Sequence, residues 1–120
     1  ISQNAAKTYA NGREGIVYAM VLHTSASMGL APVGDRTRKD LDKTFDDVVP
    51  ERWNDEFFVH TYEGRDDMPG HVKSSLFGVS VAAPFRNGEM EFAKGLGIVL
   101  NEHRYNVGSR KTAGLFIGKP

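Results

Sequence analysis

A continuous run of apolar residues, IVYAMVL at residues 16–22, most constrains the fold of this chain. The run is rich in β-branched and aromatic residues, and its length is that of a strand covered on both faces. It is far shorter than the roughly 20 residues that a membrane-spanning helix needs. We therefore expect a buried strand and no association with a membrane. The strand is followed at once by the polar residues HTSAS at 23–27, which a rigid element would hold in place.

Further strands and one hairpin are indicated along the chain. Asn87-Gly88 between two strand-like runs is the strongest short-range signal for a β-hairpin. The other expected strands cover residues 57–62, 79–85, 89–93, 97–100 and 112–117.

Two helices are expected between these strands. Residues 34–49 carry apolar side chains at helical spacing, and residues 71–77 form a shorter helix with Pro69 in its first turn. The expected capping or terminating residues are Asp35 or Thr37 and Pro50 for the first helix, and Asp66 or Asp67 and Gly78 for the second.

The length of 120 residues suggests a single domain spanning residues 1–120. Strands outnumber helices and hairpins join several of them, which favours an α+β domain. We expect a mainly antiparallel β-sandwich or flattened barrel with two or three short helices. Residues 1–14 are polar and are expected to form a peripheral segment.

Charge and cysteine content exclude some classes of function. The 15 basic and 15 acidic residues cancel, which argues against general binding to nucleic acid, because such binding depends on neutralising phosphates. The chain has no cysteine, so disulfides and thiolate metal sites are excluded. This fits the reducing cytoplasm, where we expect the protein to act. No signal peptide is visible, although the chain starts without Met.

Three histidines lie at the ends of expected elements: His23, His60 and His71. Neutral imidazole is the commonest protein ligand for zinc-like metals, and it titrates near neutral pH. If the three converge, they form a catalytic metal site with one open position. The alternative is that each only makes a local hydrogen bond, since no short HxH or HExxH spacing is present.

The segment around His71 has two further interpretations. Asp66 and Asp67 can bind a divalent cation or cap the short helix. The amino end of that helix, followed by Lys73 and Ser74, can hold a phosphate through free N–H groups and positive charge. The alternative is an exposed lysine on a helix face of small residues.

The remaining candidate site residues carry hydroxyl groups or charges. Thr24 and Ser25 offer hydroxyls beside His23, but no GxSxG motif is present, so a hydrolase triad is discounted. Glu102, Arg104 and Arg110 flank a turn. They form either a surface ion pair of small energy or a pair of arginines that grips a phosphate.

Three motifs carry a resemblance to a known family: HTSAS at 23–27, DDMPGHVKSSLFG at 66–78 and GIVLNEHR at 97–104. In this order and spacing, the chain from residue 16 to its end resembles the YjbQ family (UPF0047). The resemblance implies a compact α+β sandwich that assembles as a homotrimer, with a polar pocket near the subunit boundaries. It also implies a weak thiamine-phosphate synthase activity, which joins a pyrimidine pyrophosphate to a thiazole phosphate and expels pyrophosphate.

The resemblance can be carried over position by position. The residues that match the recurrent residues of the family are His23, His60, His71, Asp66, Lys73, Ser74, Glu102 and Arg110. The chain departs from the family at residues 92–97, which read FAKGLG where members usually read LGTWQG, and at Pro32, where an acidic residue is common. The family normally has another strand before Ile16, which residues 1–14 resemble poorly.

Two functions follow as hypotheses. The first is a thiamine-phosphate synthase-like transferase that acts on a phosphorylated small molecule, with zinc or magnesium, or otherwise a phosphate or sulfate ion, held by the histidines. The second is a non-catalytic trimeric protein that binds phosphate or metal, which the lost Trp and Gln favour. The expected catalytic residues are His23, His60, His71, Asp66 and Glu102; the phosphate-binding residues are Thr24, Ser25, Lys73, Ser74, Arg104 and Arg110; the metal ligands are His23, His60 and His71.

Overall fold

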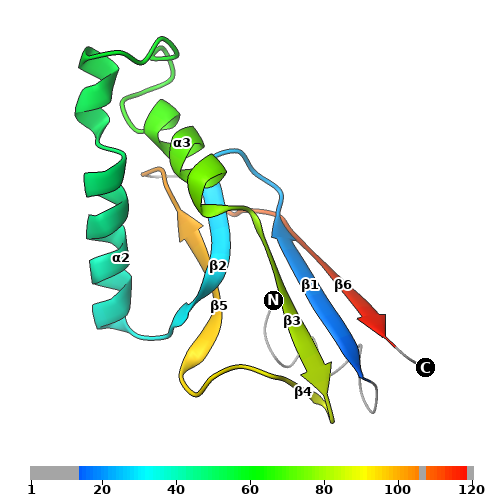
Figure 1. Cartoon of the computed structure of the whole chain (residues 1–120). Coiled ribbons are helices and arrows are strands. Elements are labelled where there is room, and N and C mark those ends of the chain that lie inside the picture. Colours follow the sequence, from blue (N-terminus) through cyan, green and yellow to red (C-terminus); the bar gives the residue numbers. More distant parts are fainter. Residues whose placement is uncertain (1–13, 106–107, 119–120) are drawn as a thin grey trace.

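The computed structural model describes residues 14–105 and 108–118, and the predicted peripheral segment lies outside them apart from Glu14. The fold belongs to the expected α+β class with antiparallel sheets (Figure 1). In chain order the elements are β1 (Gly15–Val21), β2 (Ala26–Pro32), α2 (Asp35–Val48), the 3-10 helix η1 (Glu51–Asp55), α3 (Asp67–Phe77), β3 (Ser80–Arg86), β4 (Glu89–Met90), β5 (Leu96–Glu102) and β6 (Thr112–Gly118).

The strands form two antiparallel sheets. The first has the order β4-β3-β1-β6, and the second pairs β2 with β5. The expected hairpin joins β3 to β4. Asn87 and Gly88 have φ angles of 52° and 83°, as a two-residue turn of the type I′ kind requires. Strand β4 is shorter than the predicted 89–93, because it pairs with β3 only at Glu89 and Met90.

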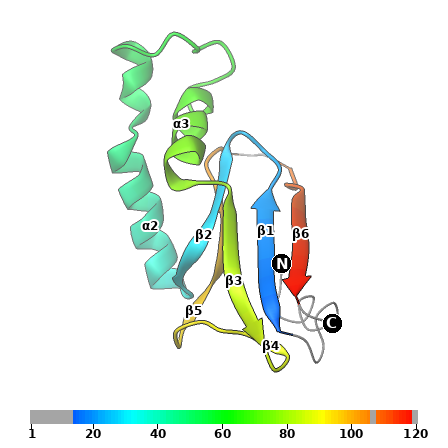
Figure 2. The same ribbon diagram turned by 45° about the vertical axis from the view of Figure 1, so that its right-hand side comes forward.

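Alternate residues of β1 build the core between the two sheets. Val17, Ala19 and Val21 are buried, and the last two pack against Met28 of β2. Ile98 of β5 packs against both apolar clusters of the core. The β2–β5 pair therefore lies against the larger sheet, between it and the helices (Figure 2).

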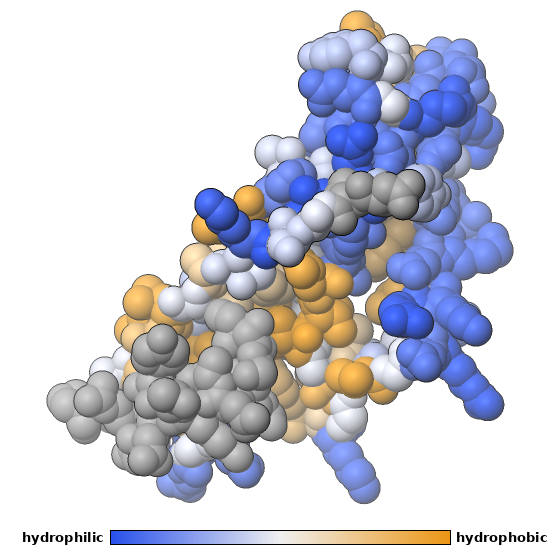
Figure 3. Space-filling view, turned by 180° about the vertical axis from the view of Figure 1, so that it is seen from behind, coloured by the Kyte–Doolittle hydropathy of each residue, from blue (hydrophilic) through white to orange (hydrophobic). Residues whose placement is uncertain are grey.

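The opposite face of the larger sheet is open. Ile16 and Tyr18 of β1 are exposed, as are Ile117 and Leu115, which lie directly opposite them on β6. The prediction that the first strand is covered on both faces is therefore wrong within one chain, because alternate side chains point to opposite faces of a sheet. From behind, hydrophobic surface is seen over the sheets, whereas the helical side is largely hydrophilic (Figure 3).

Helix α2 confirms the predicted helix at residues 34–49, and Pro50 follows its end. Its N-cap is Gly34 and no side chain caps it, so the predicted capping by Asp35 or Thr37 is wrong. The helix contacts the body of the protein through Phe45, whose ring centroid lies 4.3 Å from that of Phe77 in α3. Among the described residues, no helix combines the length and the apolar character needed to cross a membrane.

Helix α3 begins at Asp67, four residues before the predicted start at His71. Asp66 is the N-cap as expected, but its side chain makes no capping hydrogen bond. Its carboxylate instead accepts hydrogen bonds from Arg104 and from the backbone N–H of Tyr105. The backbone N–H of His71 therefore lies inside the hydrogen-bonded part of the helix, and the free N–H groups lie one turn earlier.

The predicted strand at residues 57–62 is wrong. Among residues 14–105 and 108–118 the segment pairs with no strand, and its backbone N–H groups at Phe57 and Phe58 both donate to the carbonyl of Trp53. The aromatic rings of these residues pack on Trp53, while Val59 is 94% exposed. Strand β2 was not expected, since it contains Gly and Pro, and its ladder partners all come from β5.

Candidate functional site

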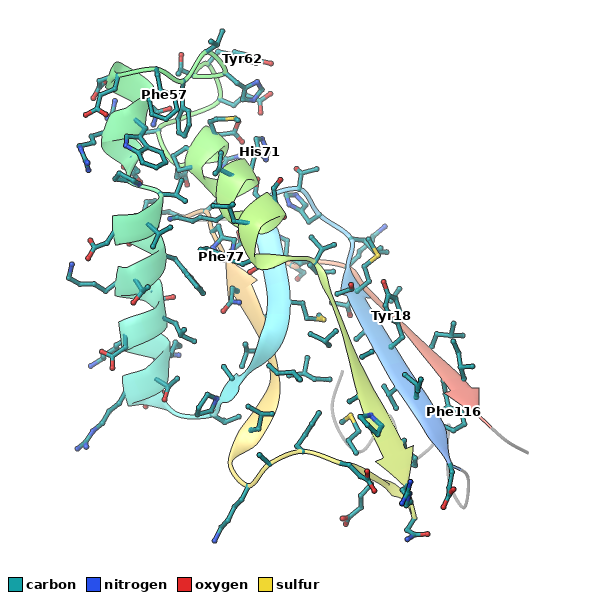
Figure 4. All side chains as sticks on the ribbon, in the orientation of Figure 1. Tyr18, Phe57, Tyr62, His71, Phe77 and Phe116 are labelled. Carbon is teal, nitrogen blue, oxygen red and sulfur yellow. The ribbon has the colours of Figure 1, made fainter. Side chains whose placement is uncertain are left out.

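Three segments bring the polar residues together at one end of the sheets: the loop after β1, the first half of α3 and the segment after β5. The backbone N–H of His103 donates to the carbonyl of Ser25, which joins the first segment to the third. Gly70 allows α3 to lie against both, because a Cβ there would be 3.3 Å from Ser25 Cβ and from the carbonyl of His103. Figure 4 shows His71 on α3, below the segment that carries Tyr62.

Asp67 lies at the centre of this surface and is only 1% exposed. Its Oδ2 is 2.8 Å from His60 Nε2 and 3.2 Å from His71 Nε2, and its Oδ1 is 3.0 Å from Arg104 Nη1. A buried carboxylate is stable as an anion only with partners of this kind. Asp67 is therefore held between one arginine and two histidines.

Glu63 joins this group from the loop before α3. One ligand atom from each of His60, Glu63, Asp67 and His71 lies within 4.8 Å of the others. Imidazole nitrogen and carboxylate oxygen are ligands that zinc and related divalent cations prefer. We call these four residues the histidine–carboxylate group; His60, Asp67 and His71 could hold one divalent cation, with the Glu63 carboxylate beside it.

The contacts of Nδ1 in His71 determine whether the other ring nitrogen, Nε2, carries a proton. His71 Nδ1 lies 3.0 Å from the carbonyl oxygen of Thr24, which can only accept, and 2.8 Å from Ser25 Oγ. The Nδ1–H therefore donates to Thr24, so the neutral ring has its lone pair on Nε2, facing the Asp67 carboxylate. The Nε2 lone pair and the Asp67 oxygen repel each other at 3.2 Å unless a proton or a cation lies between them. Donation of Nδ1–H to a backbone carbonyl is also typical of metal-binding histidines.

His23 lies outside the histidine–carboxylate group. Its Nδ1 faces the backbone N–H of Ser25 at 3.0 Å, and its Nε2 faces Arg110 Nη1 at 2.6 Å. Both neighbours are donors, so the cationic ring, with a proton on both nitrogens, is disfavoured. Partial burial, and next the charge of Arg110, lower the pKa of His23. The ring is therefore kept neutral at physiological pH.

Arg110 is held in place by Glu102. Its Nη2 lies 2.8 Å from Glu102 Oε1, and its Nε donates to the second carboxylate oxygen. Burial raises the pKa of Glu102, but the hydrogen bonds and charge of Arg110, together with the backbone N–H groups of Arg104 and His103, outweigh it, so the pKa of the carboxyl lies below its usual value. Glu102 thus positions Arg110 beside His23 and neutralises much of its positive charge.

His23 and His71 face a common open hollow of about 510 Å³. Its lining residues are His23, Thr24, His71, Ser74, Ser75, Gly78 and Val79. Ser74 is buried and donates its hydroxyl hydrogen to the carbonyl of Ala26, whereas Ser75 is exposed. The hollow is polar on the side of His71, where it borders the histidine–carboxylate group.

Lys73 points away from this hollow. It follows His71 by two positions, which is about 200° around a helix, and its buried ammonium lies 2.6 Å from Asp46 of α2. It lines a second, smaller pocket of about 240 Å³ together with Asp66, His103 and Arg104. The residues predicted to bind phosphate are therefore divided: Thr24 and Ser74 line the hollow, and Lys73 and Arg104 line the other pocket.

His103 is buried, and it is neither one of the predicted metal ligands nor one of the predicted phosphate-binding residues. Its Nε2 lies 2.8 Å from the buried Ser27 hydroxyl, which also accepts a hydrogen bond from Asn101. Burial, and next the charge of Lys73, lower the pKa of His103 to about 4. The ring is neutral in the folded protein and joins β2 to the end of β5.

Two members of the site were not predicted as ligands. The sequence leaves Asp67 as either a helix cap or a cation ligand, and no predicted role falls on Glu63. The signal for both is their spacing. His60 and Glu63 are three residues apart, and Asp67 and His71 are four apart on one helix face.

The structure thus defines a class of protein: an α+β domain with two antiparallel sheets and a histidine–carboxylate group beside an open hollow at one end of the sheets. The family model of "UPF0047 protein YjbQ-like" matches residues 1–119. The chain therefore belongs to the YjbQ (UPF0047) family, as its motifs indicated.

Curated relatives agree with this assignment. A UPF0047 protein YjbQ from Salmonella typhimurium is 43% identical over 98 residues, which cover 81% of this chain and 69% of the relative. A UPF0047 protein from Synechocystis is 36% identical over 93 residues, which cover 77% of this chain and 62% of the relative. The chain thus spans about two thirds of the length of these relatives.

Solved structures show the same fold. A YbjQ-like protein of unknown function from Sulfolobus solfataricus P2 has a TM-score of 0.79 at 16% identity, covering 89% of this chain and 75% of that one. An uncharacterized YjbQ/UPF0047 protein from Clostridium acetobutylicum has a TM-score of 0.75 at 21% identity, covering 94% and 83%.

Proposed function

We propose that the protein is a metal-dependent transferase of the thiamine-phosphate synthase type, acting on a phosphorylated small molecule. The observation that carries the proposal is the arrangement around Asp67, where one buried carboxylate oxygen faces the Nε2 atoms of both His60 and His71. The tautomer that Thr24 imposes on His71 supports a cation at this point. In the proposal Asp67 takes the place of His23 as the third ligand, and the cation is zinc or magnesium.

The hollow beside His71 is the proposed place of the substrate phosphates. Thr24 and Ser75 line it with hydroxyls, and Arg110 lies behind His23 as a source of N–H groups. A divalent cation at His71 would stabilise the charge that develops on a pyrophosphate leaving group. Ser25 then positions His71, and Glu102 positions Arg110. Asp66 is not a ligand in this proposal; its carboxylate holds Arg104 in place.

Cobalt(II) titration followed by visible absorption tests the cation, and turnover of a pyrimidine pyrophosphate with a thiazole phosphate tests the reaction. Asp67→Asn keeps the shape of the side chain but removes its charge, so cation affinity should fall at least about tenfold, as even supporting residues do when lost from metal sites. Asp47→Asn is the matched control, because Asp47 is exposed on α2 and pairs with Lys43. Unchanged affinity in D67N would contradict the proposed cation site.

A non-catalytic binding protein is the second candidate function. The observation in its favour is that the three nearby cations are already engaged, Arg110 by Glu102, Lys73 by Asp46 and Arg104 by Asp66 and Asp67. Ligand-induced stabilisation by phosphate or zinc without any product would support this candidate over the transferase.

We also propose that the chain acts in the cytoplasm as a homotrimer. The open apolar face around Ile16, Tyr18, Leu115 and Ile117 supports assembly, since contiguous apolar patches commonly mark protein contacts. The absence of cysteine is in keeping with a reducing compartment.

A further inference from the structure

The four members of the histidine–carboxylate group differ in how firmly they are held. Asp67 is fixed by Arg104, and His71 is fixed by Thr24 and Ser25. The ring of His60 lies against the ring of Tyr62, with a centroid distance of 4.5 Å. These three side chains supply two imidazole nitrogens and one carboxylate oxygen, a set that leaves one position of a tetrahedral cation open.

Glu63 is different, because its backbone is held by a hydrogen bond while its side chain is more than half exposed. Its carbonyl accepts a hydrogen bond of 2.9 Å from Arg104 Nη2, and Gly64 makes the turn that follows with a φ of 112°. The carboxylate is 53% exposed, and in the described part of the chain its one recorded contact is His60 Nε2 at 3.9 Å. An exposed carboxylate beside a cation site is suited to accept a proton from water.

We propose that the metal-loaded site also hydrolyses phosphoanhydrides, with Glu63 as the general base. The proposal rests on the cation of the proposed function and adds a reaction to it. A water molecule between the cation and Glu63 gives a proton to the carboxylate, and its oxygen forms a bond to the terminal phosphorus of a diphosphate. The bridging P–O bond breaks, its electron pair leaves with the departing phosphate anion, and Glu63 then releases its proton to solvent.

The same geometry selects the class of substrate. His23 is kept neutral between two donors, and the Nδ1–H of His71 is committed to Thr24. Among the described residues that line the hollow, neither histidine is therefore placed to protonate a leaving group. A phosphate leaves as a stable anion without this help, whereas the alkoxide of an alkyl phosphate does not. The preferred substrate is a phosphoanhydride, not an alkyl phosphate monoester.

Release of inorganic phosphate from pyrophosphate by the zinc- or manganese-loaded protein tests the proposal, with glycerol phosphate as the comparison substrate. Glu63→Gln should lower the rate about 10²- to 10⁴-fold, the range for loss of a general base, with cobalt affinity within about threefold of the parent. Glu91→Gln is the matched control, because Glu91 is a similarly exposed glutamate that pairs with Arg86. It should leave both quantities unchanged.

The outcomes separate this inference from the proposed function. Cobalt binding that depends on Asp67, together with no release of phosphate from pyrophosphate, overturns the hydrolysis and leaves the cation site standing. A full rate in E63Q overturns the role of Glu63. Equal rates on pyrophosphate and glycerol phosphate overturn the substrate class. Cobalt binding that is unaffected by D67N removes the cation site itself and the hydrolysis with it.

Discussion

Arg104 and Asp67 form an ion pair in which Nη1 lies 3.0 Å from Oδ1 and the carboxylate is 1% exposed. The same guanidinium reaches Asp66 at 3.2 Å and donates to the carbonyl of Glu63. One side chain therefore neutralises the central anion, holds the start of α3 and fixes the loop that carries Glu63. The site depends on Arg104 although Arg104 contributes no ligand atom to it.

Replacing Arg104 with alanine should destabilise the fold. Removing one partner of a buried ion pair leaves the other charge uncompensated, which costs about 3–5 kcal/mol. The lower end is expected because the Arg104 side chain is 25% exposed. Urea unfolding at pH 7 measures the loss. Arg104→Lys keeps the charge but loses the planar set of N–H donors of the guanidinium, so it should recover only part of the stability. Full recovery by lysine would show that charge alone matters.

The stability of the protein should fall in mildly acidic solution because of His103. Burial lowers the pKa of this ring to about 4, below the value of 6.5 for an exposed histidine. Folding therefore favours the neutral ring. The contribution to the free energy of unfolding is complete above pH 6.5 and is lost as the pH falls toward 4. At about 1.36 kcal/mol for each pKa unit, the loss approaches roughly 3 kcal/mol.

Urea unfolding at a series of pH values between about 4 and 8 measures this dependence. His103→Gln removes the titrating ring and should flatten the curve, while its amide can still reach the Ser27 hydroxyl. Asp66 and Glu102 also lose stabilising charge in acid, but at lower pH, because hydrogen bonds outweigh burial and lower the pKa of both carboxyls. An unchanged slope in H103Q would assign the acid sensitivity to these carboxylates.

Local chemistry explains which elements could be predicted. The hairpin at Asn87-Gly88 was predictable because its two positive φ angles depend on the turn residues themselves. Strand β2 could not be recognised, because its small residues have weak preferences and all its ladder hydrogen bonds come from β5, far away in the chain. Phe57 and Phe58 are residue types that favour strands, but here their rings pack on Trp53 and their backbone N–H groups donate to its carbonyl.

The candidate site was predictable only in part for a similar reason. Histidines at element ends indicated that His60 and His71 could meet, and their ring centroids are 5.5 Å apart. Which of the adjacent residues Asp66 and Asp67 faces them depends on where α3 begins, and the sequence placed that start too late. The predicted helix already placed Lys73 about 200° from His71, but its pairing with Asp46 depends on the packing of α2, which the sequence does not show.

Lys73 and Asp46 should respond unequally to neutral replacement. The Lys73 ammonium is 6% exposed, whereas the Asp46 carboxylate is 60% exposed. Asp46→Asn leaves a buried charge with a weaker partner and should destabilise the fold by about 1–3 kcal/mol. Lys73→Met removes the buried charge, keeps the length of the side chain and should be nearly neutral. Urea unfolding of both variants measures the difference, and the reverse order would mean that Lys73 has a role beyond this pair.

The open face of the larger sheet should set the oligomeric state. Leu115 lies directly opposite Tyr18, and Ile117 lies opposite Ile16, so four large apolar side chains form one patch. A glutamate at Leu115 places a charge in the middle of the proposed contact, and its burial would be strongly unfavourable. The mass measured by light scattering should therefore fall from three copies to one chain of 13.2 kDa, with an unchanged circular dichroism spectrum. Val59→Glu, in an exposed loop remote from the sheet, should leave the mass unchanged. A single-chain mass for the unmodified protein would overturn the proposed trimer.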